Sequence, residues 1–355
     1  MAPALSRGGA INGTVTTYDD QNALFLKKFS GEVLTAFQRR CRFKDLVQQR
    51  TIDNGKSAQF IVTGRLKTDT HTPGSEITGN QQLAQNEVTI NIDDYLYSAV
   101  ALDSLDEARA HWNIRQVHST EIGEALARAW DKRCARVLTI AARSSTSDLT
   151  ANLPTGLSPD QQIRTGTRID LSSTNATLSA DDYVAAVFAA ATKCDEKDWP
   201  EDRRYLMCSP EVYNILIQST RAINQDWNQQ GTNGSYAKGQ IAELAGFTIM
   251  KSNHIYQGNV TTTGERGYTF GGTLVSQSSV DMRRTRMLAF HPDAVGSVCL
   301  KGITTSMTGN DYDVVYNAVL LKGQYACGFG VLRPELAIEI YHSATGAPDR
   351  TGPVT

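Results

Sequence analysis

The chain has 355 residues, of which 40% are hydrophobic and 20% are charged, as is ordinary for a globular protein. Its formal net charge of −2 excludes a general electrostatic attraction to nucleic acid or to an anionic membrane surface. Nowhere do about 18 apolar residues follow one another, so the sequence predicts no transmembrane helix and no membrane partner.

The first 37 residues predict a polar arm followed by a short amphipathic helix. Residues 1–17 are small and polar and lack the apolar core of a secretion signal, which favours a disordered arm. After them, large apolar residues recur at a spacing of four, which is typical of one helix face. A helix this short needs a further surface on which to lie. The face consists of Phe25, Phe29, Val33 and Phe37.

Two segments with alternating apolar and polar residues predict a long β-hairpin. In residues 57–66, Ala58, Phe60 and Val62 alternate with polar neighbours, and residues 87–93 alternate in the same way through Val88 and Ile90. About twenty polar residues with Pro73-Gly74 lie between them, and loops of that length are usually functional or mobile. We expect the apolar face of such a hairpin to pack on another subunit.

Residues 114–143 predict one long helix of about 45 Å. Asn113 and Gln116 form a capping box at its start. Its apolar stripe consists of Ile114, Val117, Ile122, Leu126, Trp130, Cys134, Val137, Leu138 and Ala141. Its polar face consists of Arg115, Glu121, Glu124, Arg128, Asp131, Lys132 and Arg136.

The remaining segments mix helices and strands, which predicts an α+β fold. Residues 144–178 read as a polar surface excursion, and residues 241–250 as a helix end and a strand separated by Gly246. Ser179 with Asp182 and Ser209 with Pro210 mark two helix starts. The predicted strands are 203–208, 287–290, 295–303, 314–321 and 336–341.

No residue pattern indicates catalysis, a metal site or a cofactor. Within the predicted helices, His118 and Glu121 are the only local His and carboxylate pair at helical spacing. The glycine-rich run 323–330 fits a strand and a turn better than a phosphate loop. The cysteines show no C-x-x-C spacing, so we expect free, buried thiols in a reducing cytosol. They are Cys41, Cys134, Cys194, Cys208, Cys299 and Cys327.

Several segments together resemble the major capsid protein of T7-like podoviruses, which are tailed phages with double-stranded DNA. The most specific is ALFLKKFSGEVLTAF at residues 23–37, followed by GKSAQF at 55–60 and Pro73-Gly74. Further segments that resemble this family or tailed-phage capsid proteins more broadly are 122–127, 204–213, 246–247 and 332–335. The resemblance extends from about residue 20 to residue 341.

This resemblance implies the HK97-type capsid fold. The implied layout is an N-terminal arm (residues 1–50), an extended β-hairpin loop (51–100), a peripheral domain with a long spine helix (101–178), an axial domain (179–299) and a return to the peripheral domain with a C-terminal tail (300–355). It also implies a structural protein rather than an enzyme. Copies would form hexamers and pentamers of an icosahedral virion shell, assembled in the cytoplasm of a bacterial host.

The implied partners are other copies of the chain, a scaffolding protein during assembly, a portal protein at one vertex and packaged double-stranded DNA that is contacted non-specifically. The expected subunit-contact residues are Phe25, Phe29, Val33, Phe37, Phe60, Val62, Pro73, Gly74, Val88 and Ile90. An encapsulin-like nanocompartment shell is the alternative with the same fold, distinguished by an enzyme cargo that copurifies. A soluble α+β enzyme is a third hypothesis, which would need a clustered acid, base or metal set.

Overall fold

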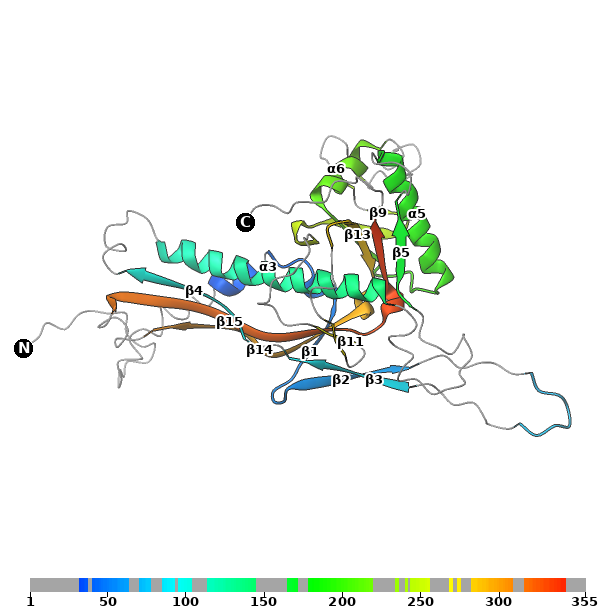
Figure 1. Ribbon diagram of the computed structural model, residues 1–355, viewed down its shortest axis with the longest axis horizontal. Helices are drawn as coiled ribbons and strands as arrows, with labels where there is room; N and C mark the ends of the chain where they lie inside the picture. The colour runs from blue at the N-terminus through cyan, green and yellow to red at the C-terminus, as the bar shows by residue number, and fades with distance from the viewer. Residues whose placement is uncertain are drawn as a thin grey trace, which may run out of the picture. The chain divides into compact units, whose positions relative to one another are not determined.

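The computed structural model shows a mixed α+β chain with one long helix (Figure 1). It describes residues 32–37, 40–63, 70–77, 85–92, 95–103, 114–144, 165–171, 178–219, 234–235, 240–241, 243–255, 268–270, 273–275, 282–308 and 316–342. The expected arm at residues 1–17, the cap at Asn113 and the candidates Phe25 and Phe29 lie outside this part of the chain.

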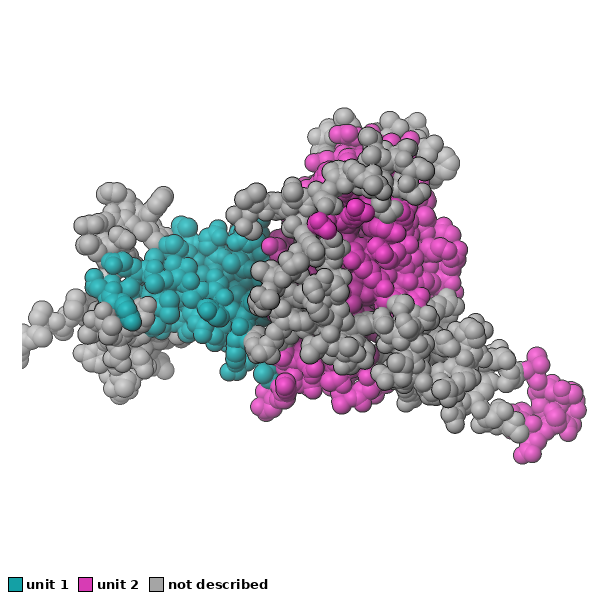
Figure 2. Space-filling view, in the orientation of Figure 1, with its two compact units in different colours: residues 1–41, 93–130, 299–327 teal, residues 42–92, 131–298, 328–355 magenta. Residues whose placement is uncertain are grey.

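The contacts divide the chain into two compact units (Figure 2). Unit 1 comprises Met1–Cys41, Asp93–Trp130 and Cys299–Cys327. Unit 2 comprises Arg42–Ile92, Asp131–Val298 and Gly328–Thr355. Each unit therefore combines segments that are far apart in the sequence, and three elements contribute residues to both: helix α3 (Ile114–Arg143), β14 (Val295–Met307) and β15 (Ala318–Val331).

Helix α3 has the predicted bounds, and Ile122, Leu126, Trp130 and Cys134 of its predicted stripe are buried. Val117 was expected in that stripe but is 57% exposed. It lies five residues before Ile122, which is about 140° around a helix, so it points away from the buried face.

Asp131, expected on the polar face of α3, is fully buried in unit 2. Its carboxylate accepts hydrogen bonds from the backbone N–H groups of Arg42 (2.9 Å) and Phe43 (3.2 Å), and it lies 2.7 Å from Nδ1 of His254. Residues from two other segments thus cover this side of the helix. Burial of a carboxylate is tolerable because these partners satisfy its oxygens.

The first sheet has the strand order β1-β14-β15-β11-β12, and β4 also pairs with β15. β4 (Leu96–Asp103) runs antiparallel to β15, with Leu96 opposite Tyr325 and Asp103 opposite Ala318. In unit 1, Gly323 on β15 lies under α3, where a side chain would meet Ile122 and Leu126. The other strands are β1 (Gln48–Thr51), β11 (Tyr268–Phe270) and β12 (Thr273–Val275).

The second sheet lies within unit 2 and has the order β5-β16-β13-β6-β10-β9. All six residues of β13 (Thr285–Phe290) are buried, as expected for a strand covered on both faces. Helix α5 (Ala180–Glu196) lies beside β5 and helix α6 (Pro210–Gln218) (Figure 1). The other strands are β5 (Thr167–Asp170), β6 (Tyr205–Cys208), β9 (Glu243–Leu244), β10 (Phe247–Lys251) and β16 (Ala337–Tyr341).

Both helix starts predicted in this region are confirmed. Ser179 and Asp182 form a reciprocal capping box at the start of α5. The Ser209 hydroxyl accepts a hydrogen bond from the Val212 N–H, and Pro210 occupies the first turn of α6. Local side-chain chemistry therefore determines where these helices begin.

Three local interpretations of the sequence are wrong. Residues 144–178 were expected to form a surface excursion without a strand, but they contain β5, which pairs in parallel with β16; residues 145–164 and 172–177 lie outside the described part of the chain. Residues 243–251 form a β9–β10 hairpin rather than a helix end, because Ala245 (φ 51°) and Gly246 (φ 79°) make a tight turn. Residues 323–330 lie in continuous strand β15 without a turn.

The expectation of six free thiols is also wrong. Cys299 on β14 and Cys327 on β15 form a disulfide, with their Cα atoms 4.2 Å apart. Cys41, Cys134, Cys194 and Cys208 form no disulfide. Burial raises the pKa of the Cys194 thiol to about 12 and raises the pKa of Cys208 further. The bridge depends on the register of two strands, which spacing in the sequence does not reveal.

Candidate subunit-contact surfaces

The predicted hairpin is confirmed as a two-stranded antiparallel sheet of β2 (Ser57–Thr63) and β3 (Gln85–Asn91). Ser57 pairs with Asn91 at one end and Thr63 with Gln85 at the other. On one face Ala58, Val88 and Ile90 are buried, with Ile90 only 1% exposed. On the other face Ile61 is 77% exposed, so the two faces differ sharply.

The root of the hairpin, which here means Ile90 and Asn91 of β3, packs on glycines of β14 and β15 within unit 2. These glycines form its seat. A side chain at Gly330 would lie 2.6 Å from Cγ1 of Ile90, and one at Gly296 would lie 3.1 Å from its Cδ1. A side chain at Gly328 would collide with the carbonyl oxygen of Asn91. The glycines therefore let the hairpin backbone approach the strands closely.

The packing of the hairpin root within this chain bears on two of the predicted subunit-contact residues. Val88 and Ile90 were expected to contact another subunit, but their side chains are buried in this chain. Phe60 is partly exposed, and the side chain of Val62 lies outside the described set. Glycines at 328 and 330, alternating within a strand, are the sequence signal that could have indicated the seat.

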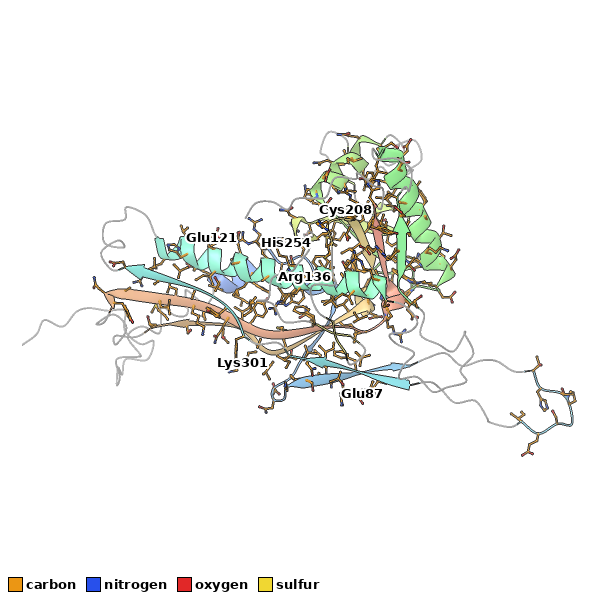
Figure 3. All side chains as sticks on the ribbon, in the orientation of Figure 1. Glu87, Glu121, Arg136, Cys208, His254 and Lys301 are labelled. Atoms are coloured by element: carbon orange, nitrogen blue, oxygen red, sulfur yellow. A yellow bond between two sulfur atoms is a disulfide. The ribbon has the colours of Figure 1, made fainter. Side chains whose placement is uncertain are left out.

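A groove of about 780 Å³ follows the exposed side of β2. The guanidinium of Arg50 lies 5.8 Å from the centre of the Phe60 ring, and its Nη1 donates a 2.7 Å hydrogen bond to the carbonyl oxygen of Gln59. Glu87 on β3, labelled in Figure 3, also belongs to the residues that line the groove. The complete lining is Arg50, Ile52, Ser57, Ala58, Gln59, Phe60, Ile61 and Glu87.

The outer edge of β2 is open to a further strand. The carbonyl of Lys56 accepts a hydrogen bond from the Ile92 N–H. Because backbone groups alternate in direction along a strand, those of Lys56 and of every second residue after it face β3. Those of Gln59 and Ile61 face the other way, where the Gln59 carbonyl already accepts the hydrogen bond from Arg50. Among the described residues no strand pairs with that edge. Unpaired strand edges readily accept a strand from another chain.

Pro73 and Gly74 form an exposed turn. The Ser75 N–H and its hydroxyl both donate hydrogen bonds to the carbonyl oxygen of Thr72, at 3.1 Å and 2.6 Å. Gly74 has a φ of 90°, which a type II turn requires at its third residue, and proline suits the second. Ile77, close behind the turn, is 79% exposed.

The described part of the amphipathic N-terminal segment lies within unit 1 and is helical at residues 32–37. Val33 is 0% exposed and Phe37 is 2% exposed, with the Phe37 ring edge-on to Tyr325 at 6.3 Å. A side chain at Gly123 would lie 2.6 Å from the Val33 carbonyl oxygen, so this segment packs closely on α3. The apolar surface of Val33 and Phe37 is thus already covered by this chain.

The described carboxylates and histidines are of residue types that can bind a metal ion. Within the described ranges, no three His, Cys, Asp or Glu side chains are grouped so that they could hold a metal ion. No helix in the same part of the chain is long and apolar enough to span a membrane. The buried carboxylates of Asp131 and Glu339 instead accept hydrogen bonds from neighbouring segments.

The burial of His291 predicts that unit 2 is less stable in acid. Burial lowers the pKa of His291 below 6.5, and the charges of Arg203 and Arg204 lower it further, while those of Asp293 and Asp202 oppose the shift. The unfolded state therefore binds the proton more readily than the folded state. We expect the free energy of unfolding to be highest above about pH 6.5 and to fall as the pH drops below it.

A His291→Asn variant tests this pH dependence. An asparagine carbonyl can still accept the hydrogen bond that Nδ1 of His291 accepts from the Asp293 N–H. Urea unfolding between pH 7.5 and pH 5.5 should show a smaller loss of stability on acidification in the variant than in the wild type. Equal losses in both proteins would contradict the role given to His291.

Comparisons with known proteins identify the family of the chain. The family model described as "Gp10A-like: Major capsid protein" matches residues 59–341. The capsid structure of the cyanophage P-SCSP1u has 35% sequence identity and a TM-score of 0.72, covering 97% of this chain and 100% of that one. The major capsid protein of Escherichia phage T7 is 27% identical over 93% of this chain and 96% of its own length.

A second solved capsid structure is also similar to this chain in fold. The mature capsid of bacteriophage PhiM1, at 17% identity and a TM-score of 0.67, covers 87% of this chain and 88% of that chain and shares its fold. These similarities favour the phage shell over the encapsulin-like alternative and over an enzyme. The chain belongs to the Gp10A-like family of major capsid proteins, and its fold is of the HK97 type.

Proposed function

We propose that copies of this chain assemble as hexamers and pentamers into an icosahedral shell that encloses packaged double-stranded DNA. The observation that carries the proposal is the two-faced hairpin. Its root is fixed by Ile90 between Gly296 and Gly330, while Ile61 on its opposite face is 77% exposed. A hairpin that is rigidly based and open on one face and one edge is suited to contact a neighbouring subunit.

In this proposal the neighbour covers the groove and the edge of β2. Ile61 on the exposed face and the partly exposed Phe60, which also lines the groove, supply apolar surface. Fully burying an exposed side chain of this size contributes about 1.5–3 kcal/mol. Backbone groups along the open edge of β2 can add hydrogen bonds. Each contact is weak alone, but every subunit of a closed shell makes it, so the whole assembly is stable.

The turn at Pro73-Gly74 and the N-terminal residues Phe25 and Phe29 complete the proposed contact set. The turn is exposed and conformationally defined, since proline and glycine at these positions restrict the chain. Val33 and Phe37 anchor the N-terminal segment to its own subunit. They would thereby hold the preceding residues in a position to reach a neighbour.

We further propose the partners of a tailed-phage shell: a scaffolding protein during assembly, a portal protein at one vertex and DNA contacted non-specifically. The net charge of −2 supports a wall that contains DNA without binding it tightly. The mature location is the virion, and assembly takes place in the cytoplasm of the bacterial host. The proposed layout of arm, extended loop, peripheral domain and axial domain follows the ranges given above.

Shortening the hairpin tests the proposal. Replacing residues 67–84 by Asn-Gly keeps β2 and β3 intact, because β3 begins at Gln85. We expect an unfolding midpoint close to that of the wild type, since Ile90 and its glycine seat are unchanged. We also expect no closed shells by negative-stain microscopy when scaffolding protein is supplied.

The wild-type chain, prepared in parallel with the same scaffolding protein, is the control for assembly. Circular dichroism of both proteins tests whether the variant is folded. Closed shells in normal number from the shortened variant would show that the tip has no role in subunit contact.

A further inference from the structure

The disulfide between Cys299 and Cys327 joins the two ends of one segment of unit 1. Cys299 and Cys327 are the first and last residues of the third segment of that unit, and 28 positions separate them in the sequence. The bridge therefore ties β14 to β15 where this segment begins and ends. Cys299 is partly exposed, whereas Cys327 is 3% exposed.

A disulfide bridge is not expected in the reducing cytoplasm in which the proposed shell is built. Thiols in a bacterial cytoplasm are kept reduced, so a structural disulfide is rare there. A virion, by contrast, leaves that compartment when the host cell opens. The same pair of cysteines thus experiences both a reducing and an oxidising environment.

We propose that Cys299 and Cys327 are a dithiol during folding and assembly, and that a low-molecular-weight disulfide oxidises them to the bridge after the particle leaves the cell. This inference rests on the proposed function, because it requires assembly in a reducing cytoplasm. It assigns to the pair a modification site that locks two central strands of the shell protein after assembly is complete.

The reaction is two successive thiol–disulfide exchanges. The Cys299 thiolate, on the more accessible residue, attacks one sulfur of the small disulfide, forms a mixed disulfide and releases one small thiolate. The Cys327 thiolate then attacks the Cys299 sulfur and releases the second. One S–S bond breaks and one forms, and the two cysteine protons end on the two released thiols.

The other cysteines do not compete well for this reaction. Cys134, Cys194 and Cys208 are fully buried, and burial raises the pKa of each thiol, so little thiolate is available. Cys41 is only partly buried and could form a mixed disulfide of its own. A Cys41→Ser variant is therefore the background for the experiment.

The bridge should raise the thermal stability of the particle protein. Closing a loop of this length restricts the unfolded chain, and for a protein of this size the expected rise in the unfolding midpoint is about 5 °C. The rise should be absent when either cysteine is replaced. Cys299→Ser in the Cys41→Ser background is the matched control, because it removes one sulfur and leaves the partner in place.

The experiment counts thiols by mass spectrometry at two stages. Cells that produce the chain are opened in denaturant with N-ethylmaleimide, which should label all five cysteines of the Cys41→Ser protein. Assembled particles are separately treated with oxidised glutathione and then denatured with the same reagent, and three labels should remain. A peptide pair linked through Cys299 and Cys327 should appear only in the second sample.

Three results would overturn the inference. They are a bridge already present in the quenched cells, five labels after treatment with oxidised glutathione, and an equal rise in the unfolding midpoint in the Cys299→Ser control. Particle formation is scored separately by microscopy. Particles that form but never acquire the bridge refute this inference alone, whereas a failure to form particles refutes the proposed function.

Discussion

Replacing Gly328 by valine should displace the hairpin root and abolish shell assembly. A side chain at this position would collide with the backbone oxygen of Asn91, at less than 3.0 Å. A backbone atom cannot rotate away as the end of a side chain can, so β3 must shift and Ile90 must leave its seat. We expect the free energy of unfolding to fall by about 3 kcal/mol, at the upper end for overpacking.

Gly302→Val is the matched control for this substitution. Gly302 lies on β14, and a side chain added there meets nothing within 4 Å. Valine also suits a strand, so this variant should unfold like the wild type. Urea unfolding and sedimentation of both variants test the comparison. Normal shells from Gly328→Val, or equal damage from Gly302→Val, would show that the close approach at Gly328 does not position the hairpin.

Replacing Glu339 by alanine should cause the second large loss of stability, within unit 2. Glu339 is 0% exposed on β16, and its carboxylate accepts hydrogen bonds from Arg143 Nε and Nη2 at 2.7 Å and 2.6 Å. It also accepts hydrogen bonds from Arg168 Nε at 3.0 Å and from the Thr285 hydroxyl at 2.6 Å. This one carboxylate thus joins α3, β5, β13 and β16.

Removing Glu339 leaves these donors without their acceptor and opens a small cavity. Breaking a buried ion pair from one side typically costs about 3–5 kcal/mol. The lower end, about 3 kcal/mol, is expected here because both arginines reach solvent, with side chains 23% and 42% exposed. Glu339→Gln should lose less, since the amide oxygen can still accept a hydrogen bond.

Arg168→Ala provides a reference for the loss of unfolding free energy in Glu339→Ala. Arg168 is the more exposed arginine and also stacks on Tyr341 at 4.0 Å, so its removal should cost less than the removal of Glu339. Urea unfolding of the three variants gives the order Glu339→Ala, Glu339→Gln, Arg168→Ala from most to least damaging. A loss below about 1 kcal/mol for Glu339→Ala would show that the carboxylate is not a structural junction.

The features that the sequence predicted correctly depend on local chemistry. The alternation around Ala58 and Val88 identified the hairpin because side chains of a strand point to opposite faces in turn. Ser179 and Ser209 identified two helix starts because their hydroxyls satisfy nearby N–H groups. Such signals need only a few neighbouring residues.

The features that the sequence missed depend on distant segments. Asp131 looked like part of a polar helix face, since its partners Arg42, Phe43 and His254 lie far away in the chain. The Cys299–Cys327 bridge requires a strand register that no spacing rule supplies. Neither pattern nor composition can show which distant segment will cover a given side chain.

The candidate contact residues also show this difference between local and distant information. Their apolar character was visible in the sequence, but it could not distinguish burial within one chain from contact between two. Val33, Phe37, Val88 and Ile90 are buried in this chain. The exposed face around Ile61, which was not among the predicted contact residues, is now the strongest candidate for contact with a neighbour.

The most direct measurement is negative-stain microscopy of the purified full chain after incubation with its scaffolding protein, with sedimentation velocity on the same sample. If the exposed face of the hairpin is completed by other copies, the chain will appear as closed particles of uniform diameter. A chain that stays monomeric at high concentration, with scaffolding protein present and no particles on the grid, would contradict the account.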